Sequence, residues 1–240
     1  MRAIILSAGQ GSRLLPLTAD RPKCLIDFNG RTLIDWQLDM LAANGVTEAT
    51  VVTGFRDDQV AAAIARRSAG PKVTLRFNPF YKVADNLGSV WIAREDIAGD
   101  CLVLNGDTLV SQSLVAKVLA AGRPGIAVTV DEKDDYDADD MKVVREADGR
   151  LTAIGKRLPP GYNAESIGLI VFRGDGAERF RAAVDAMLRT PEGTTNWYLK
   201  AIHAIAQDQR VETVSILGEE WGEVDFPDDV IAARALTASW

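Results

Sequence analysis

The sequence predicts an α/β fold in which a mainly parallel, mixed sheet is covered by helices on both faces. Through the first half of the chain, short apolar runs alternate with longer segments of helical periodicity. Strands that alternate with helices need crossover connections, which place the strands parallel and the helices against the sheet. The 240 residues, 47% of which are hydrophobic, are enough to bury a sizeable core.

The apolar runs of the first half are expected to form the strands Ala3–Ser7, Thr50–Thr53, Val73–Phe77 and Cys101–Asn105. Apolar side chains at helical spacing predict helices over Leu33–Asn44, Asp57–Arg67, Ser89–Arg94 and Leu114–Ala121. Each of these helices follows a strand, as a crossover connection requires.

The second half is more mixed. We expect strands over Ile126–Val130, Lys142–Val144, Leu151–Ile154 and Ser166–Phe172. Helices are expected over Ala177–Leu188, Trp197–Ala206 and Pro227–Leu236. Because no linker rich in proline, glycine or serine separates the two halves, we expect one domain over residues 1–240, with a small lobe inserted at about 131–165.

Charge and composition argue against several classes of function. The formal net charge of −7 is unlike that of a nucleic-acid-binding protein, which normally presents a basic face. No apolar stretch approaches the roughly 20 residues that cross a bilayer, so no membrane association is expected. His203 is the only histidine, which argues against a zinc cluster or a histidine-based triad.

The two cysteines indicate a reducing compartment. Cys24 and Cys101 lie in apolar, strand-like contexts and give no disulfide framework, so we expect buried thiols in a cytoplasmic protein. The sequence leaves the oligomeric state open, with a homodimer as one option.

The most informative segment is a glycine loop directly after the first strand, Leu6–Leu14, which continues to Pro22 and Lys23. Glycines let backbone N–H groups approach phosphate oxygens without a Cβ clash. Arg13 and Lys23 add fixed positive charge where a triphosphate would lie. The loop lacks the Gly-Lys-Ser/Thr ending of a P-loop, and Leu14 stands where a dinucleotide fingerprint has its third glycine.

Carboxylates follow two other segments. Cys101–Asn105 delivers Asp107 to the carboxyl end of a predicted strand, the edge at which open α/β sheets bind ligands. Glu223 and Asp225 are expected on one face of a short strand that precedes a proline-started helix. Carboxylate oxygens suit Mg²⁺. Each segment also has a plainer interpretation, because such residues often cap turns and helices.

The stretch Asp131–Asp140 is strongly acidic. One interpretation is a solvated surface loop. The other is that the stretch borders a site for a cationic group of a substrate. The sequence leaves both open.

These features together resemble the nucleotidyltransferase superfamily, and within it the bacterial choline-phosphate and aminoalkylphosphonate cytidylyltransferases. The resemblance spans essentially the whole chain. Beyond the glycine loop it depends on Asn78–Tyr81, Asn86–Ala93, Asp140–Val144, Ile154–Lys156, Glu165–Gly168, Asn196–Tyr198 and Trp221–Asp225. It implies a Rossmann-like, GT-A-like fold with an acceptor-side lobe at about 131–165.

The resemblance implies that CMP passes from CTP to a small phosphate or phosphonate acceptor, with Mg²⁺ as cofactor. Arg13, Lys23 and Asp107 are then the catalytic residues, and Asp107, Glu223 and Asp225 hold the metal. The expected nucleotide-binding residues are Leu6, Ala8, Gly9, Gly11, Ser12, Arg13, Lys23, Asn86, Ser89 and Gly106.

The resemblance implies an acceptor that carries an amine, and a cationic head group needs aromatic faces and carboxylates, which are present in the second half. Lys156, at the end of a predicted strand in the lobe, matches the position at which relatives bind the acceptor phosphate. The expected acceptor-binding residues are Asp85, Tyr136, Lys142, Lys156, Glu165, Trp197, Tyr198 and Trp221, with Tyr162 as a further aromatic candidate.

Three alternatives remain. A sugar-1-phosphate nucleotidylyltransferase using UTP or dTTP is favoured by Gly88-Ser89, which is similar to the Gly-Thr or Gly-Ser of those enzymes. A retaining glycosyltransferase would usually carry Asp-x-Asp, and the strand instead ends Gly106-Asp107-Thr108. A nucleotide-sensing module without activity would not need Lys23 or the metal carboxylates.

Overall fold

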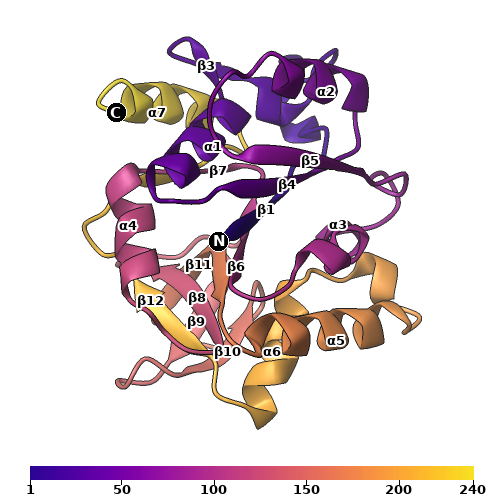
Figure 1. Ribbon diagram of the computed structural model, residues 1–240. Helices are drawn as coiled ribbons and strands as arrows, with labels where there is room; N and C mark the ends of the chain where they lie inside the picture. Colours follow the sequence, from indigo (N-terminus) through magenta and orange to yellow (C-terminus); the bar gives the residue numbers. More distant parts are fainter.

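The computed structural model describes residues 1–240, and one sheet of nine strands dominates it (Figure 1). The strand order is β10-β9-β11-β6-β1-β4-β5, and β8 and β12 extend the sheet from β11. The strands are β1 (Arg2–Leu6), β4 (Glu48–Thr53), β5 (Lys72–Phe77), β6 (Cys101–Asn105), β8 (Ile126–Asp131), β9 (Lys142–Arg145), β10 (Leu151–Gly155), β11 (Ala164–Phe172) and β12 (Glu212–Ser215). The expected α/β class is confirmed.

The first half of the chain builds the parallel part of the sheet. Strand β1 pairs in parallel with both β4 and β6, and β4 pairs in parallel with β5. Strand β11 runs antiparallel to β6, β8 and β9, so the pairing in the sheet changes from parallel to antiparallel at β11. The carboxyl ends of β1 and β6 therefore lie side by side, and the segments that follow both strands meet at that edge.

Helices cover both faces of the sheet (Figure 1). They are α1 (Leu33–Ala43), α2 (Asp57–Ala65), α3 (Asn86–Ile92), α4 (Gln112–Ala120), α5 (Gly176–Leu188), α6 (Leu199–Asp208) and α7 (Pro227–Thr237). Side chains alternate between the two faces of a strand, so Ile4 packs with α3, α5 and α6 while Ile5 packs with α1, α2 and α4.

A third, smaller core lies under α7. It joins Leu14 of the glycine loop, Leu109 and Val224 to Val230 on the helix. Two short antiparallel pairs border this region: β2 (Asp27–Phe28) with β3 (Arg31–Thr32), and β7 (Thr108–Val110) with β13 (Trp221–Glu223). The β7–β13 pair thereby holds Trp221–Glu223, near the end of the chain, against Thr108–Val110, which follows β6.

The expected elements are present, with ends that differ by a few residues. The strand Cys101–Asn105 is confirmed at both ends, whereas α6 begins at Leu199 instead of Trp197. Strand β12 and the β2, β3 and β7 pieces were not predicted, because each is short and lacks a long apolar run. The division into a domain with a lobe at about 131–165 stays a prediction. None of the helices has both the length and the hydropathy to cross a membrane.

Candidate active site

The glycine loop bends back over the end of β1. Gly11 has φ 77°, a left-handed conformation that favours glycine, and a Cβ there would come within 3.0 Å of the Lys23 side chain. The Thr18 hydroxyl donates to the Gly11 carbonyl at 2.8 Å. The loop thus packs against the Lys23 side chain at Gly11. At Gly9 an added Cβ would have no neighbour within 4 Å, so this part of the loop is open to a ligand.

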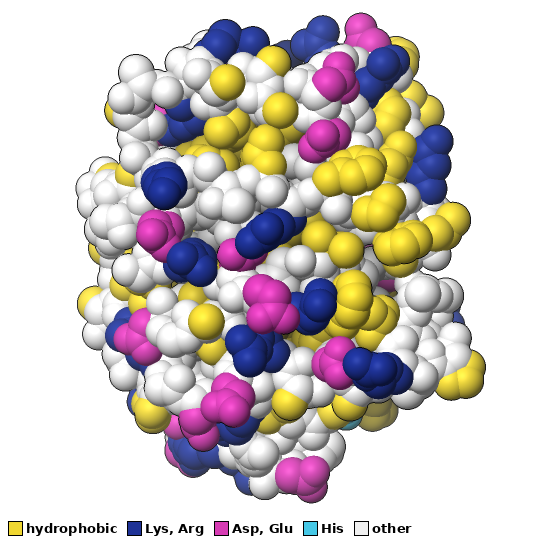
Figure 2. All heavy atoms as spheres, turned by 45° about the vertical axis from the view of Figure 1, so that its right-hand side comes forward, with side chains coloured by type: hydrophobic (Ala, Val, Ile, Leu, Met, Phe, Trp, Pro, Cys, Tyr) yellow, Lys and Arg dark blue, Asp and Glu magenta, His cyan; other side chains and the backbone are white.

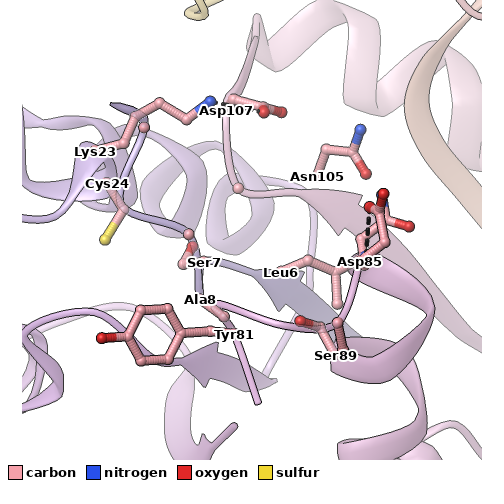
Figure 3. A pocket seen from close by; sticks show the side chains of 15 residues that line it. Leu6, Ser7, Ala8, Lys23, Cys24, Tyr81, Asp85, Ser89, Asn105 and Asp107 are labelled. Carbon is pink, nitrogen blue, oxygen red and sulfur yellow. Dashed lines mark hydrogen bonds and ion pairs between the residues drawn. The ribbon is translucent and has the colours of Figure 1, made fainter. Parts of the chain in front are cut away.

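A pocket of about 240 Å³ lies between this loop, the end of β6 and the start of α3 (Figure 3). Leu6, Ala8, Gly9, Gly11, Lys23, Asn86, Ser89 and Gly106 all line it, as expected of nucleotide-binding residues. Asp85, which was expected near the acceptor, also lines this pocket and caps α3 by accepting from the Asn86 N–H. Sequence reasoning missed Ser7, Cys24, Tyr81, Ala84 and Asn105, which complete the lining.

A second hollow of about 350 Å³ continues along the outer side of the loop. Ser12 and Arg13, both expected at the nucleotide, line it together with Tyr81, Lys82 and Asp225. Lys82 was not predicted, because nothing in its local sequence places it opposite the glycine loop. The second hollow presents the cations Arg13 and Lys82 beside backbone N–H groups, which suits phosphate oxygens.

The turn that carries Asp107 is fixed from two sides. A Cβ on Gly106 would come within 2.3 Å of the Leu6 carbonyl oxygen, so only glycine lets β6 end this close to β1. The buried amide of Gln37 on α1 donates to the carbonyls of Asn105 and Thr108, each at 2.8 Å. These contacts hold Asp107 at the carboxyl edge of the sheet.

The carboxylates Asp107, Glu223 and Asp225 gather within 4.8 Å of one another. Pairing of β13 with β7 brings in Glu223, and the Val224 N–H donates to the Asp107 carbonyl at 3.0 Å. Asp225 was expected on the same strand face as Glu223, but it lies beyond the end of β13. Its backbone N–H instead donates to the Asp229 carboxylate at the start of α7.

The ammonium of Lys23 bridges two of these carboxylates. Its Nζ donates to Asp107 Oδ2 at 2.9 Å and to Asp225 Oδ1 at 2.7 Å. Burial disfavours the charge of Lys23, but the carboxylates of Asp107 and Asp225 more than offset this and raise the pKa of Lys23. Lys23 is therefore a fixed positive charge.

The cluster of three carboxylates, Asp107, Glu223 and Asp225, fits a divalent cation. The buried Asp107 Oδ1 has no hydrogen-bond partner, although a buried carboxylate oxygen normally finds one. Glu223 lies at the exposed edge of the group, yet burial of its carboxyl and the negative charges of Asp107 and Asp225 raise its pKa. A cation among these oxygens would relieve that repulsion, and hard oxygen ligands are those that Mg²⁺ prefers.

Arg13 links the carboxylates to the acidic loop at 131–140. Its Nη1 lies 3.2 Å from Asp225 Oδ2 and 3.7 Å from Asp139 Oδ2. Lys156 at the end of β10 also pairs with Asp139, at 3.5 Å. Most of the acidic loop is exposed, and its residue Asp139 pairs with Arg13 and Lys156, so one side of the loop borders the site. On the face shown in Figure 2, acidic and basic side chains alternate across the middle.

The expected acceptor-binding aromatics are already paired with lysines of the chain. Lys156 Nζ lies 5.3 Å from the Trp197 ring centroid, and Lys133 Nζ lies 5.6 Å from that of Tyr136. Lys142 is buried, and its Nζ lies 5.6 Å from the Tyr162 ring. No aromatic cage stands ready for an external ammonium group.

Glu165 and Trp221 are also engaged within the chain. Glu165 is buried and pairs with Lys133 at 3.0 Å, and Lys133 in turn pairs with Asp140 at 2.8 Å. Burial raises the pKa of Glu165 to about 7, although the bond from Lys133 opposes this. The Trp221 indole N–H donates to Asp131 at 2.7 Å. The roles of Glu165 and Trp221 at the acceptor stay predictions.

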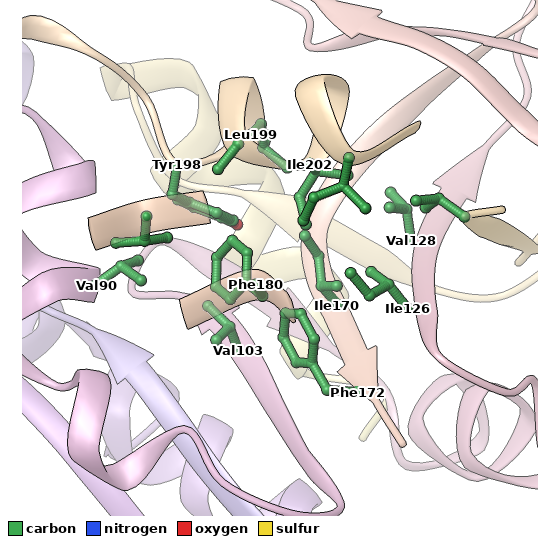
Figure 4. Close-up of a cluster of buried hydrophobic side chains, with 14 of the residues drawn as sticks. Val90, Val103, Ile126, Val128, Ile170, Phe172, Phe180, Tyr198, Leu199 and Ile202 are labelled. Atoms are coloured by element: carbon green, nitrogen blue, oxygen red, sulfur yellow. The ribbon is translucent and has the colours of Figure 1, made fainter. Parts of the chain in front are cut away.

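The prediction that Tyr198 contacts the acceptor is wrong. Tyr198 is completely buried, and its ring packs edge-on against Phe180 in the core (Figure 4). Its hydroxyl donates to Asn105 Oδ1 at 2.9 Å. Tyr198 packs against Phe180 of α5, and its hydroxyl reaches the lining of the glycine-loop pocket through the bond to Asn105.

Known proteins resemble this chain over nearly its whole length. Residues 2–153 match the model of the nucleotidyl transferase family. A CTP:phosphoglutamine cytidylyltransferase of Campylobacter jejuni is 24% identical, over 96% of this chain and 98% of its own. The CMP-5'-(3-aminopropyl)phosphonate synthase of Streptomyces rubellomurinus is 28% identical over 95% of this chain, which spans 37% of that longer protein.

Solved structures agree on the fold. The CTP:phosphocholine cytidylyltransferase of Streptococcus pneumoniae superposes with a TM-score of 0.80 at 20% identity, covering 98% of each chain. A UDP-glucose pyrophosphorylase matches with a TM-score of 0.83 at 13% identity, over 99% of this chain and 98% of its own. Both carry the GT-A-like arrangement described above, and the family match covers the glycine loop, Lys23 and Asp107. The chain belongs to the nucleotidyl transferase family and is a nucleotidyltransferase enzyme.

Proposed function

We propose that this enzyme transfers CMP from CTP to a small, amine-bearing phosphate or phosphonate and releases pyrophosphate, with Mg²⁺ as cofactor. Candidate acceptors are phosphocholine, phosphoethanolamine and 2-aminoethylphosphonate. The observation that carries the proposal is the bridge from Lys23 to Asp107 and Asp225 at the floor of the glycine-loop pocket. The named activities of the relatives from Campylobacter and Streptomyces support CTP as donor and a phosphorylated or phosphonate acceptor.

The nucleotide would lie across the two adjoining hollows. The pocket of about 240 Å³ at Ala8 and Ser89 would take the base. The Ser89 hydroxyl accepts from the Asn78 amide at 3.1 Å, which fixes it for contact with the base. The triphosphate would extend over Gly9 and Gly11 toward Arg13 and Lys82.

The reaction needs little covalent participation from the protein. An acceptor oxygen that is already anionic attacks the α-phosphorus in line. A new phosphorus–oxygen bond forms while the bond to the bridging oxygen of the β-phosphate breaks, and the electron pair leaves with pyrophosphate. No general base is required. The task is to bring two polyanions together, so positioning and charge neutralisation supply most of the rate.

Each residue then has a defined part. Backbone N–H groups of the loop and Arg13 hold the triphosphate, and Lys23 faces the charge that grows as the bond to pyrophosphate breaks. Asp107, Asp225 and Glu223 would hold Mg²⁺, which supplies neutralisation of the phosphoryl oxygens. Lys156 would hold the acceptor phosphate, and the amine would meet the carboxylate of Asp139, which pairs with Lys156, or that of Glu165, which pairs with Lys133.

The test is a pyrophosphate-release screen with Mg²⁺. CTP, UTP, dTTP, ATP and GTP are each combined with the three candidate acceptors, glucose-1-phosphate and N-acetylsugar-1-phosphates. We expect turnover with CTP and an amine-bearing acceptor. Turnover only with a sugar-1-phosphate and UTP or dTTP would instead establish the second candidate, a sugar-1-phosphate nucleotidylyltransferase, which Gly88-Ser89 in the wall of α3 favours.

A further inference from the structure

A cavity of about 610 Å³ opens beside Lys156, between the end of β10 and the start of α6. Its apolar wall includes Met141, Ile154 and Leu158, and the indole of Trp197 forms another side. The cavity is separate from the nucleotide pocket, with which it shares no lining residue. It has room for an organic group several times larger than a methyl ammonium.

The polar lining of this cavity is entirely basic or hydrogen-bond donating. Lys156, Arg157, Lys200 and His203 line it, and no aspartate or glutamate does. The His203 Nδ1 accepts from the Ile154 N–H at 3.2 Å, so the neutral ring presents its proton on Nε2 as a donor. In a chain with a formal net charge of −7, such a lining selects for an anion.

Two of these cations have no carboxylate to neutralise them. Lys200 donates to the neutral Asn196 side-chain oxygen, and neither Lys200 nor Arg157 forms an ion pair. The cavity also receives the amino-terminal turn of α6, whose positive end adds to the field. An anionic ligand would gain these charges without displacing an existing partner.

The surroundings of Trp197 argue against an ammonium group as the ligand of this cavity. Lys156 Nζ lies 5.3 Å and Lys200 Nζ 5.9 Å from its ring centroid, so the aromatic face that could hold an ammonium group already has cations beside it. A quaternary ammonium placed there would meet like charges.

The cavity is connected to the chemistry by a series of ion pairs. Lys156 pairs with Asp139, Asp139 with Arg13, and Arg13 with Asp225 of the carboxylate group. Lys156 therefore belongs both to the lining of the cavity and to the ion pairs that reach the carboxylates, so a phosphate bound at Lys156 would have the cavity beside it.

We infer that the acceptor carries a carboxylate in addition to its phosphate or phosphonate, and that Lys200, Arg157 and His203 bind this carboxylate. The inference rests on the proposed function for the identity of the reacting group. It narrows the acceptor class from amine-bearing phosphates and phosphonates in general to those that also carry a carboxylate, and it makes phosphocholine a poor acceptor.

The test compares two compounds that differ only by a carboxylate, O-phospho-L-serine and phosphoethanolamine. Binding is measured by calorimetry, and turnover with CTP is measured by pyrophosphate release. We expect wild-type enzyme to prefer phosphoserine by about tenfold or more, the size of one charge-assisted contact. Lys200→Gln and Arg157→Gln should each reduce this ratio severalfold, and Lys200→Arg should restore it. Lys72→Gln, an exposed lysine on β5 remote from the cavity, is the control.

The two measurements separate the two proposals. Equal binding of both compounds, or a preference that Lys200→Gln and Arg157→Gln leave intact, would refute the carboxylate site. A binding preference that depends on Lys200, without any turnover by CTP, would support the carboxylate site and refute the proposed cytidylyl transfer.

Discussion

Lys23 Nζ and Asp107 Oδ2 are 2.9 Å apart, although 84 positions separate the two residues in the sequence. The pair joins the segment after the glycine loop to the end of β6. A carboxylate that could hold a metal is thus paired with a cation of the protein itself.

Asp107→Ala should lower the turnover number about 10²- to 10⁴-fold, because one carboxylate anchors the cation that neutralises the transferring phosphoryl. The fold should survive, since Asp107 lies at the ligand edge of the sheet and is not part of a hydrophobic core. Pyrophosphate release over a range of Mg²⁺ concentrations, with thermal melting as the folding check, decides the matter. A folded variant that keeps its activity would remove Asp107 from the metal site.

Lys23→Ala and Arg13→Ala should differ in which kinetic constant they change. Lys23 faces charge that grows in the transition state, so its loss should act mainly on kcat. Arg13 also holds the ground-state triphosphate and should raise KM for CTP as well. Steady-state kinetics at saturating acceptor separates the two cases. An effect of Lys23→Ala on KM alone would mean that its role is ground-state binding.

Two glycine substitutions should separate folding from nucleotide binding. An added Cβ at Gly9 meets no atom within 4 Å, so Gly9→Ala should leave the melting temperature unchanged. It should weaken the binding of CTP, because the methyl group would occupy space that the triphosphate needs. Gly106→Ala places its Cβ 2.3 Å from the Leu6 carbonyl oxygen and should destabilise by roughly 2 kcal/mol or more. If Gly9→Ala binds CTP as the wild type does, the loop does not contact the triphosphate.

Glu165 should make stability depend on pH. Burial raises its pKa to about 7 in the folded chain, above an unfolded value near 4.3. The folded state therefore binds the proton more tightly, and this stabilisation is complete below about pH 4 and lost as pH rises through about 7. Relative to Glu165→Gln, the wild type should lose up to about 3 kcal/mol of unfolding free energy between pH 4.5 and 8.

Urea unfolding of the wild type and of Glu165→Gln at each pH measures the difference between their free energies of unfolding. Glu192→Gln, an exposed glutamate without an ion pair, is the control and should show no such trend. A difference between wild type and Glu165→Gln that stays constant with pH would mean that Glu165 is ionised throughout.

Local patterns were sufficient to predict the mainly parallel sheet. The apolar runs at Ala3–Ser7 and Cys101–Asn105 predicted two of its strands, and their pairing with each other is seen only in the structure. The glycine loop can be identified from the sequence without a distant partner. The carboxylates Asp107, Glu223 and Asp225 could be predicted as a group because each follows a strand or precedes a helix. Their closeness depends on the β7–β13 pair, which is too short for a sequence signal.

The acceptor side could not be predicted in the same way. Tyr198 lies in the core against Phe180, and the local sequence does not show which side of its segment the fold buries. Whether an aromatic ring is free for a ligand depends on lysines far away in the sequence, as with Lys156 beside Trp197. Charge composition of the acidic loop suggested a cation site, but much of that charge is balanced by ion pairs that form only on folding.

The bridge between Lys23 and Asp225 spans 202 positions of sequence. Contacts of such long range form late, because the entropy of closing a long loop must be overcome before they stabilise the fold. Strand and helix content should therefore return before catalysis when the denatured protein is diluted into buffer, and a chain still emerging from the ribosome cannot assemble the three carboxylates until residues 223–225 have left it. Nucleotide turnover then begins only once the segment around Asp225 has docked, so activity reports the completion of folding.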